Sequence, residues 1–161
     1  VDAVVTLDVP GTPPPVPRGS YAMAQRNVAF APHVLIVPVG ATVSFPNQDR
    51  VRHHVYSFSS AKKFDLKLYG RDETKSVSFA KPGIVALGCN IHDMMSGFVF
   101  VTATPFAAVS DREGRVTIDG VPPGQVTLSI WHPSIRASGN SLSQAKSVAA
   151  TGLSTVVSIS R

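Results

Sequence analysis

Residues 88–97 read GCNIHDMMSG and contain the only cysteine of the 161-residue chain, Cys89. His92 follows three positions later, and Met95 follows six positions later. The runs on both sides are apolar and bounded by glycine, which is typical of strands, so the stretch is predicted to be a loop between two strands. A thiolate, an imidazole and a thioether on one loop form a soft set of donors, which suits copper better than magnesium or calcium.

A trigonal copper site of one cysteine and two histidines, with a weak axial methionine, needs one histidine more than this loop offers. The upstream pair His53-His54 can supply it. Neighbouring residues of a strand point to opposite faces, so only one of the pair is expected to bind, and the alternation alone leaves both open. The other expected ligands are Cys89 as a thiolate, His92 as a neutral imidazole and Met95 in the axial position.

A lone cysteine is often just a buried structural residue, and this is the alternative interpretation of Cys89. The spacing of His92 and Met95, the flanking strands and the upstream histidine pair together favour a metal ligand instead. His33 and His132 have no soft ligand near them in sequence and are expected to be hydrogen-bonded structural residues.

The composition excludes several classes of protein. With 43% hydrophobic and 16% charged residues, the chain is expected to fold into one large or two small domains. Thirteen prolines and twelve glycines favour short strands joined by turns. A single cysteine excludes an intrachain disulfide and cysteine-rich zinc or iron–sulfur sites. No basic tract with interleaved aromatics indicates nucleic-acid binding, and no apolar run approaches the roughly 20 residues that span a membrane.

The hydrophobic pattern predicts strands along most of the chain. Clear alternation or short apolar runs occur at 34–37, 42–45, 55–58, 76–79, 83–87 and 98–101. The charged segment 59–75 is instead expected to be an exposed excursion, with a short helical turn near 61–63. After Thr104 a run of hairpins is predicted, and 156–159 is expected to be the last strand.

The residues from about 23 to 104 resemble the cupredoxins, which are type 1 (blue) copper proteins. The segments that carry the resemblance are Val37–Asn47 (VPVGATVSFPN), the pair His53-His54 with its following valine, and the Cys89 loop. The chain is most similar to plastocyanin- and amicyanin-like proteins often labelled methylamine utilisation proteins. The resemblance implies a Greek-key β-sandwich around one copper ion that cycles between Cu(I) and Cu(II). It also favours His53 over His54, and Met95 over Met94, as ligands.

The chain departs from the family's usual pattern at Ile91, where a proline usually precedes the loop histidine, and at His54, where an asparagine usually follows the upstream ligand. Residues beyond Thr104 are similar to the prealbumin-like modules of carboxypeptidases, which carry an Asp-x-x-Gly turn before a Pro-Pro-Gly turn. The opening segment 2–7 resembles an early strand of that module.

We therefore expect an all-β chain, with a cupredoxin sandwich and a small second β-sandwich. The expected parts are an N-terminal strand and proline-rich linker that pairs with the C-terminal module (1–18), the cupredoxin domain (19–104) and the prealbumin-like module (105–161).

The resemblance implies a periplasmic electron carrier rather than an enzyme. Its partner would be a redox protein, such as a c-type cytochrome or a periplasmic oxidoreductase. No leader is visible, since the chain opens on the strand-like Val1-Asp2-Ala3-Val4-Val5, as a mature periplasmic protein or a truncated chain would. The alternative function is a copper-binding or trafficking module without electron shuttling.

Overall fold

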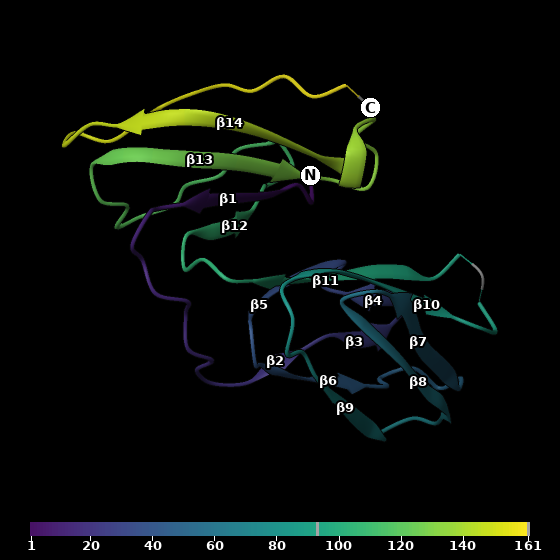
Figure 1. Ribbon diagram of the computed structural model, residues 1–161. Helices are drawn as coiled ribbons and strands as arrows, with labels where there is room; N and C mark the ends of the chain where they lie inside the picture. The colour runs from purple at the N-terminus through teal and green to yellow at the C-terminus, as the bar shows by residue number, and fades with distance from the viewer. Residues whose placement is uncertain (93, 161) are drawn as a thin grey trace. The chain divides into compact units, whose positions relative to one another are not determined.

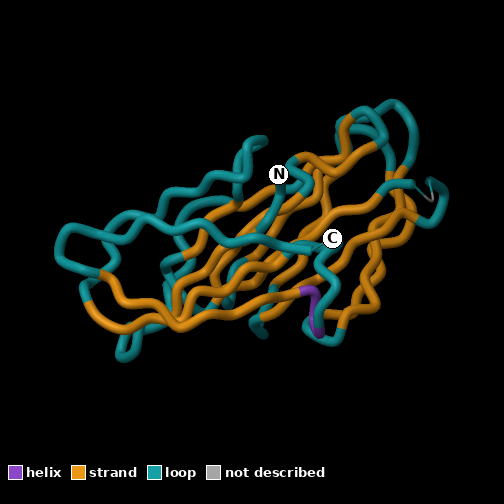
Figure 2. The backbone as a smooth tube through the Cα atoms, turned by 90° about the horizontal axis from the view of Figure 1, so that it is seen from above, coloured by secondary structure: helices purple, strands orange, loops and turns teal. Residues whose placement is uncertain are grey.

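A computed structural model describes residues 1–92 and 94–160; Asp93 of the cysteine loop and Arg161 at the end of the predicted module lie outside the described residues. Figure 2 shows strands and loops along the described residues, and the short 3₁₀ helix η1 (Ser138–Asn140) in purple. The expectation of an all-β protein is confirmed. The chain divides into a central unit, Pro15–Ala103, and a terminal unit made of Val1–Pro14 and Thr104–Arg161.

The central unit consists of two main sheets and a hairpin (Figure 1). The larger sheet has the order β5-β11-β10-β7-β8, with strands β5 (Val34–Pro38), β11 (Ser96–Thr102), β10 (Gly83–Cys89), β7 (His53–Ser59) and β8 (Lys62–Tyr69). The smaller sheet has the order β2-β6-β9, with β2 (Tyr21–Ala22), β6 (Thr42–Pro46) and β9 (Thr74–Ser78). The hairpin pairs β3 (Ala24–Arg26) with β4 (Ala29–Ala31).

Alternation of the side chains builds the core of this unit. Val43 and Phe45 of β6, and Val99 and Val101 of β11, are buried at every second position. Because successive side chains of a strand point to opposite faces, each strand contributes one face to the core. Each fully buried large apolar side chain contributes about 1.5–3 kcal/mol, so this alternation fixes the register of the strands.

The segment predicted to be an exposed excursion contains an eight-residue strand, β8, which pairs with β7. The prediction was wrong because the charged residues hid a two-residue period. Phe64 and Leu66 are partly buried against the core, while the charged residues that alternate with them, Lys63, Asp65 and Lys67, are exposed. A strand at the edge of a sheet tolerates such charges because one of its faces meets solvent.

Gly97 lies where β11 passes closest to Phe30 of β4. A Cβ atom at position 97 would lie 2.9 Å from the Cβ of Phe30 and 3.1 Å from two further atoms of its side chain. The Phe30 Cβ is fixed to the backbone and cannot rotate away. The glycine is therefore required here for close packing.

We expect Gly97→Ala to lower the free energy of unfolding by about 1–3 kcal/mol, the usual cost of overpacking a core. Chemical denaturation of the metal-free protein measures this change. Gly70→Ala is the matched control, because its nearest neighbour would be a Glu73 oxygen at 3.6 Å, an ordinary contact. Equal stability of the two variants would contradict this account of Gly97.

The terminal unit joins the two ends of the chain in one sheet. Strand β1 (Val4–Asp8) lies between β12 (Ala107–Val109) and β13 (Gly124–Trp131), and β13 also pairs with β14 (Ser141–Val148) (Figure 1). All three of these pairings are antiparallel. The unit has a core of its own, formed by alternate residues of β1 and β13.

Two expected strands of this unit are not regular strands in the structure. No strand is assigned within 115–123, which lies in the predicted run of hairpins, or within 153–160, where the last strand was expected. Val116, Ile118, Val157 and Ile159 nevertheless pack against the sheet's core. The apolar alternation therefore predicted which side chains are covered but not the backbone pairing. Among the described residues, no helix has the length and apolar character needed to cross a membrane.

Candidate metal centre

The larger sheet of the central unit brings the two distant parts of the candidate site together. Strand β7 begins at His53 and strand β10 ends at Cys89. The two strands are antiparallel neighbours, with Cys89 opposite Val55. The start of one strand therefore lies beside the end of the other, and the loop that follows Cys89 carries His92 and Met95 back over this end of the sheet.

The donor atoms converge on one point. The Sγ atom of Cys89 lies 3.9 Å from Nδ1 of His53 and 3.6 Å from Nδ1 of His92. One ligand atom from each of these three residues lies within 4.8 Å of the others. The two imidazole rings are 5.0 Å apart between centroids, at an angle of 57°. Met95 lies near these three residues and is 3% exposed.

Cys89 is almost completely buried and accepts a hydrogen bond from the backbone. The N–H of His54 donates to its Sγ atom at 3.5 Å. The imidazole of His54 does not join the cluster, because it contacts the carboxylate of Asp65 on β8 instead. His54 therefore supports the sulfur through its peptide group, while its side chain lies on the other face of the strand.

The carboxylate of Asp49 contacts the imidazole of His53 at the ring nitrogen that faces away from Cys89. Its Nε2 atom lies 2.8 Å from Oδ2 of Asp49, and the His53 side chain has no exposed surface. Burial acts to raise the pKa of Asp49, but hydrogen bonds from Val28, His53 and Asn27 outweigh it and hold the pKa below its ordinary value. Asp49 is therefore an anion that accepts a hydrogen bond from the Nε2–H of His53, which leaves the Nδ1 of His53 to face Cys89.

Tyr69, which lies opposite His53 on β8, is a structural neighbour of the site. Its hydroxyl donates to the carbonyl of Phe45 at 2.7 Å. Burial raises the pKa of Tyr69 above its ordinary value, and the nearby Cys89 acts in the same direction. The phenol thus stays neutral and offers no metal ligand or base.

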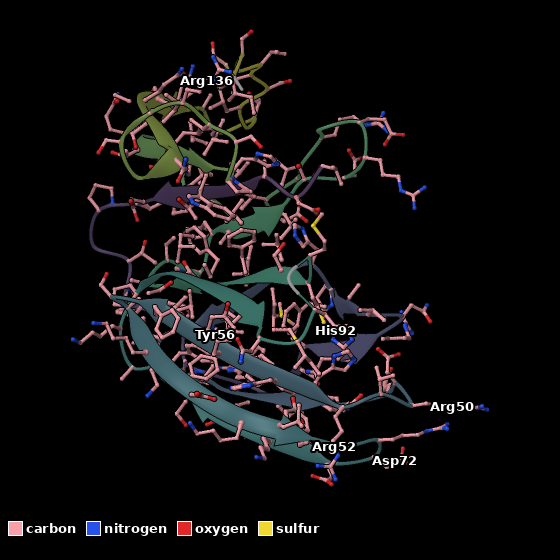
Figure 3. All side chains as sticks on the ribbon, turned by 90° about the vertical axis from the view of Figure 1, so that its right-hand side faces the viewer. Arg50, Arg52, Tyr56, Asp72, His92 and Arg136 are labelled. Carbon is pink, nitrogen blue, oxygen red and sulfur yellow. The ribbon has the colours of Figure 1, made fainter. Side chains whose placement is uncertain are left out.

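His92 lies at the exposed edge of the cluster. It is half-buried, and it accepts a turn hydrogen bond at its carbonyl from the N–H of Met95 at 2.8 Å. Its neighbour Ile91 is 51% exposed, and the side chain of Met94 is 96% exposed. In the view of Figure 3, His92 lies on the side of the central unit from which Arg50 extends away from the ribbon.

The structure thus brings His53, Cys89, His92 and Met95 into one place and leaves His54 and Met94 out of it. His33 and His132 are not part of the cluster. The ring of His33 meets Phe98 edge-on at 5.6 Å, and Nδ1 of His132 accepts the N–H of Ser134 at 3.1 Å.

Asp49 is the neighbour of the cluster that the sequence pattern did not indicate. It lies four residues before His53, in the polar segment 47–49 that reads as a strand break. A loop carboxylate at that spacing has no distinctive signature, because the loop between the two positions can take many shapes. Only the folded loop reveals its contact with the ring.

The chemistry of this donor set fits copper. One thiolate, two imidazole nitrogens and a thioether are the set found in trigonal sites with a weak axial methionine. Hard oxygen donors are absent from the three-residue cluster among the described residues, which disfavours magnesium and calcium. Burial of Cys89 and His53 keeps water from these donors, as a redox metal site requires.

The sequence matches no protein-family model and no curated protein. Solved structures do resemble it. A copper-containing nitrite reductase from Thermus scotoductus is 27% identical with a TM-score of 0.51, and the match covers 58% of this chain but 26% of that one. A purple cupredoxin from Nitrosopumilus maritimus is 23% identical over 52% of this chain and all of that one, with a TM-score of 0.48.

A reduced proline-to-phenylalanine variant of amicyanin is also 23% identical, over 60% of this chain and 99% of that one, with a TM-score of 0.48. The chain spans about a quarter of the nitrite reductase, so this similarity concerns one part of that enzyme. The strand order of the central unit, its convergent Cys-His-His donors and the similarity to the reductase agree: this chain contains a cupredoxin fold.

Proposed function

We propose that this protein is a type 1 copper protein that carries single electrons between redox partners. His53, Cys89, His92 and Met95 would hold one copper ion, with Met95 as a thioether donor beside the three others. The observation that carries the proposal is the convergence of a buried thiol and two imidazole nitrogens within 4.8 Å of one another. Copper, when bound, supplies the one-electron couple between Cu(II) and Cu(I).

The protein's own contribution is rigidity. Cys89 and His53 are anchored on paired strands of one sheet, and both side chains are buried. A packed sandwich resists rearrangement of such residues, because its interior has the density of a crystal. Ligands held in one arrangement for both oxidation states keep the structural change during electron transfer small.

Electrons would enter and leave through the imidazole edge of His92, the one half-exposed member of the cluster. The exposed Ile91 and Met94 beside it form a small apolar surface where a partner can dock. Arg50 and Arg52, both exposed in the loop before His53, and the net charge of +5 favour an acidic partner. A c-type cytochrome or a periplasmic oxidoreductase has the required chemistry.

We propose a periplasmic location because the chain resembles the cupredoxins. The terminal unit is proposed to be a prealbumin-like module, since strands from both ends of the chain pair in its sheet. The proposed role needs no catalysis within this chain. The methylamine-utilisation label stays a prediction.

Loading the full chain with copper tests the proposal. We expect one equivalent to bind, with a visible thiolate-to-copper absorption band, an EPR signal from Cu(II) and a reversible wave in voltammetry. The trafficking alternative predicts rapid loss of the metal to a chelator and no reversible wave. A copper-loaded protein that stays colourless, or binds no copper, would contradict the proposed function.

A further inference from the structure

We propose that Asp49 is a positioning residue for the ligand His53, fixing its ring and its tautomer, and that its carboxylate lowers the reduction potential of the site. This inference rests on the proposed function. Its geometric basis is the contact of 2.8 Å between Oδ2 of Asp49 and Nε2 of His53, the ring nitrogen remote from the cluster.

The tautomer follows from the partners of the two ring nitrogens. A carboxylate only accepts hydrogen bonds, so Nε2 of His53 must carry the proton. Nδ1 of the neutral ring is then a lone pair, and it faces Sγ of Cys89 at 3.9 Å. Donation to a carboxylate orients a ligating imidazole and raises its basicity, which favours the higher oxidation state of a bound metal.

The carboxylate is itself held rigidly, by the hairpin β3–β4. Its Oδ1 accepts the N–H of Asn27 at 2.7 Å, and its Oδ2 accepts the N–H of Val28 at 2.9 Å. These two residues form the turn between the strands, with φ angles of 54° and 56°. Such a turn usually contains glycine, and valine is disfavoured there. The two bonds to Asp49 therefore stabilise an unfavourable turn and at the same time fix the carboxylate.

A second support comes from the buried residue Asn47. Its Oδ1 accepts the backbone N–H of Asp49 at 2.9 Å. Its Nδ2 donates to the carbonyls of Val51 at 2.9 Å and Tyr69 at 3.1 Å. The loop that carries Asp49 is thus tied to β8, so the carboxylate, the ring of His53 and the sheet form one connected unit.

The test uses the full chain with Asp49→Ala, which removes the acceptor, and Asp49→Asn, which keeps an oxygen but removes the charge. In the metal-free wild type, ¹⁵N NMR should show the neutral ring of His53 with its proton on Nε2. Asp49→Ala should give a mixture of tautomers and lower the affinity for copper by about 10–100-fold. Asp49→Asn should raise the reduction potential.

The matched control is Asp72→Asn, which removes the same charge from a side chain that is 88% exposed. Its potential should stay near that of the wild type. If Asp49→Ala keeps the wild-type tautomer and affinity, or if Asp49→Asn shifts the potential no more than the control does, the proposal is wrong. If Asp49→Ala fails to fold, the difference in reduction potential between Asp49→Asn and Asp72→Asn decides the question.

Failure of this inference can be told apart from failure of the proposed function. A wild-type protein that binds no copper, but whose His53 tautomer depends on Asp49, refutes the copper function only. The inference alone is refuted if the wild type is coloured and redox-active but the Asp49 variants keep its His53 tautomer, its copper affinity and its reduction potential.

Discussion

Cys89→Ser is expected to abolish the visible absorption of the copper-loaded protein and most of its copper binding. A serine hydroxyl is not deprotonated as a thiol is and is a hard donor, so the strongest bond to the metal is lost. The fall in affinity should exceed the roughly 100-fold that loss of an outer hydrogen-bond partner costs. Copper titration followed by absorption and EPR measures both effects.

The same variant should leave the fold intact. Serine is close to cysteine in size, and the N–H of His54, which donates to Cys89 Sγ at 3.5 Å, can donate to a hydroxyl instead. Metal-free Cys89→Ser should therefore unfold with a free energy within about 2 kcal/mol of the wild type. A Cys89→Ser protein that keeps the coloured copper site would show that the sulfur is no ligand.

Replacing the two adjacent histidines separately should give opposite results. His53→Ala should lose the coloured site, because its buried Nδ1 is one of the three convergent donors. His54→Ala should keep the site, because its support of Cys89 comes from the backbone N–H, which alanine retains. The comparison is matched, since both changes remove the same side chain.

Affinity for copper and the absorption band measure the difference between these two variants. The loss of stability in His54→Ala should be small, since the contact it breaks with Asp65 is partly exposed to solvent, where ion pairs contribute little. Hydrogen bonds from Lys67 and His54 keep the pKa of Asp65 low, at about 2, so that carboxylate stays charged without the imidazole at neutral pH. Equal loss of copper in the two variants would contradict the assignment of His53.

Strand β8 illustrates where the sequence pattern misled. Its alternation of Phe64 and Leu66 with charged residues is a two-residue period, but the lysines around it suggested an exposed excursion. Hydrophobicity averaged over a window cannot separate an edge strand from a charged loop. Pairing with β7 resolved the difference, because only the neighbour's hydrogen bonds make the segment a strand.

The sequence by itself determined the all-β class and the donors of the cysteine loop. Both are local properties: a two-residue period requires strands, and the spacing of Cys89, His92 and Met95 places three soft donors on one short loop. Only the tertiary structure decided that His53 faces the cysteine while His54 turns toward Asp65, and that Asp49 lies behind the ring. These contacts depend on strand register and on the path of a loop, which are set by residues far apart in the chain.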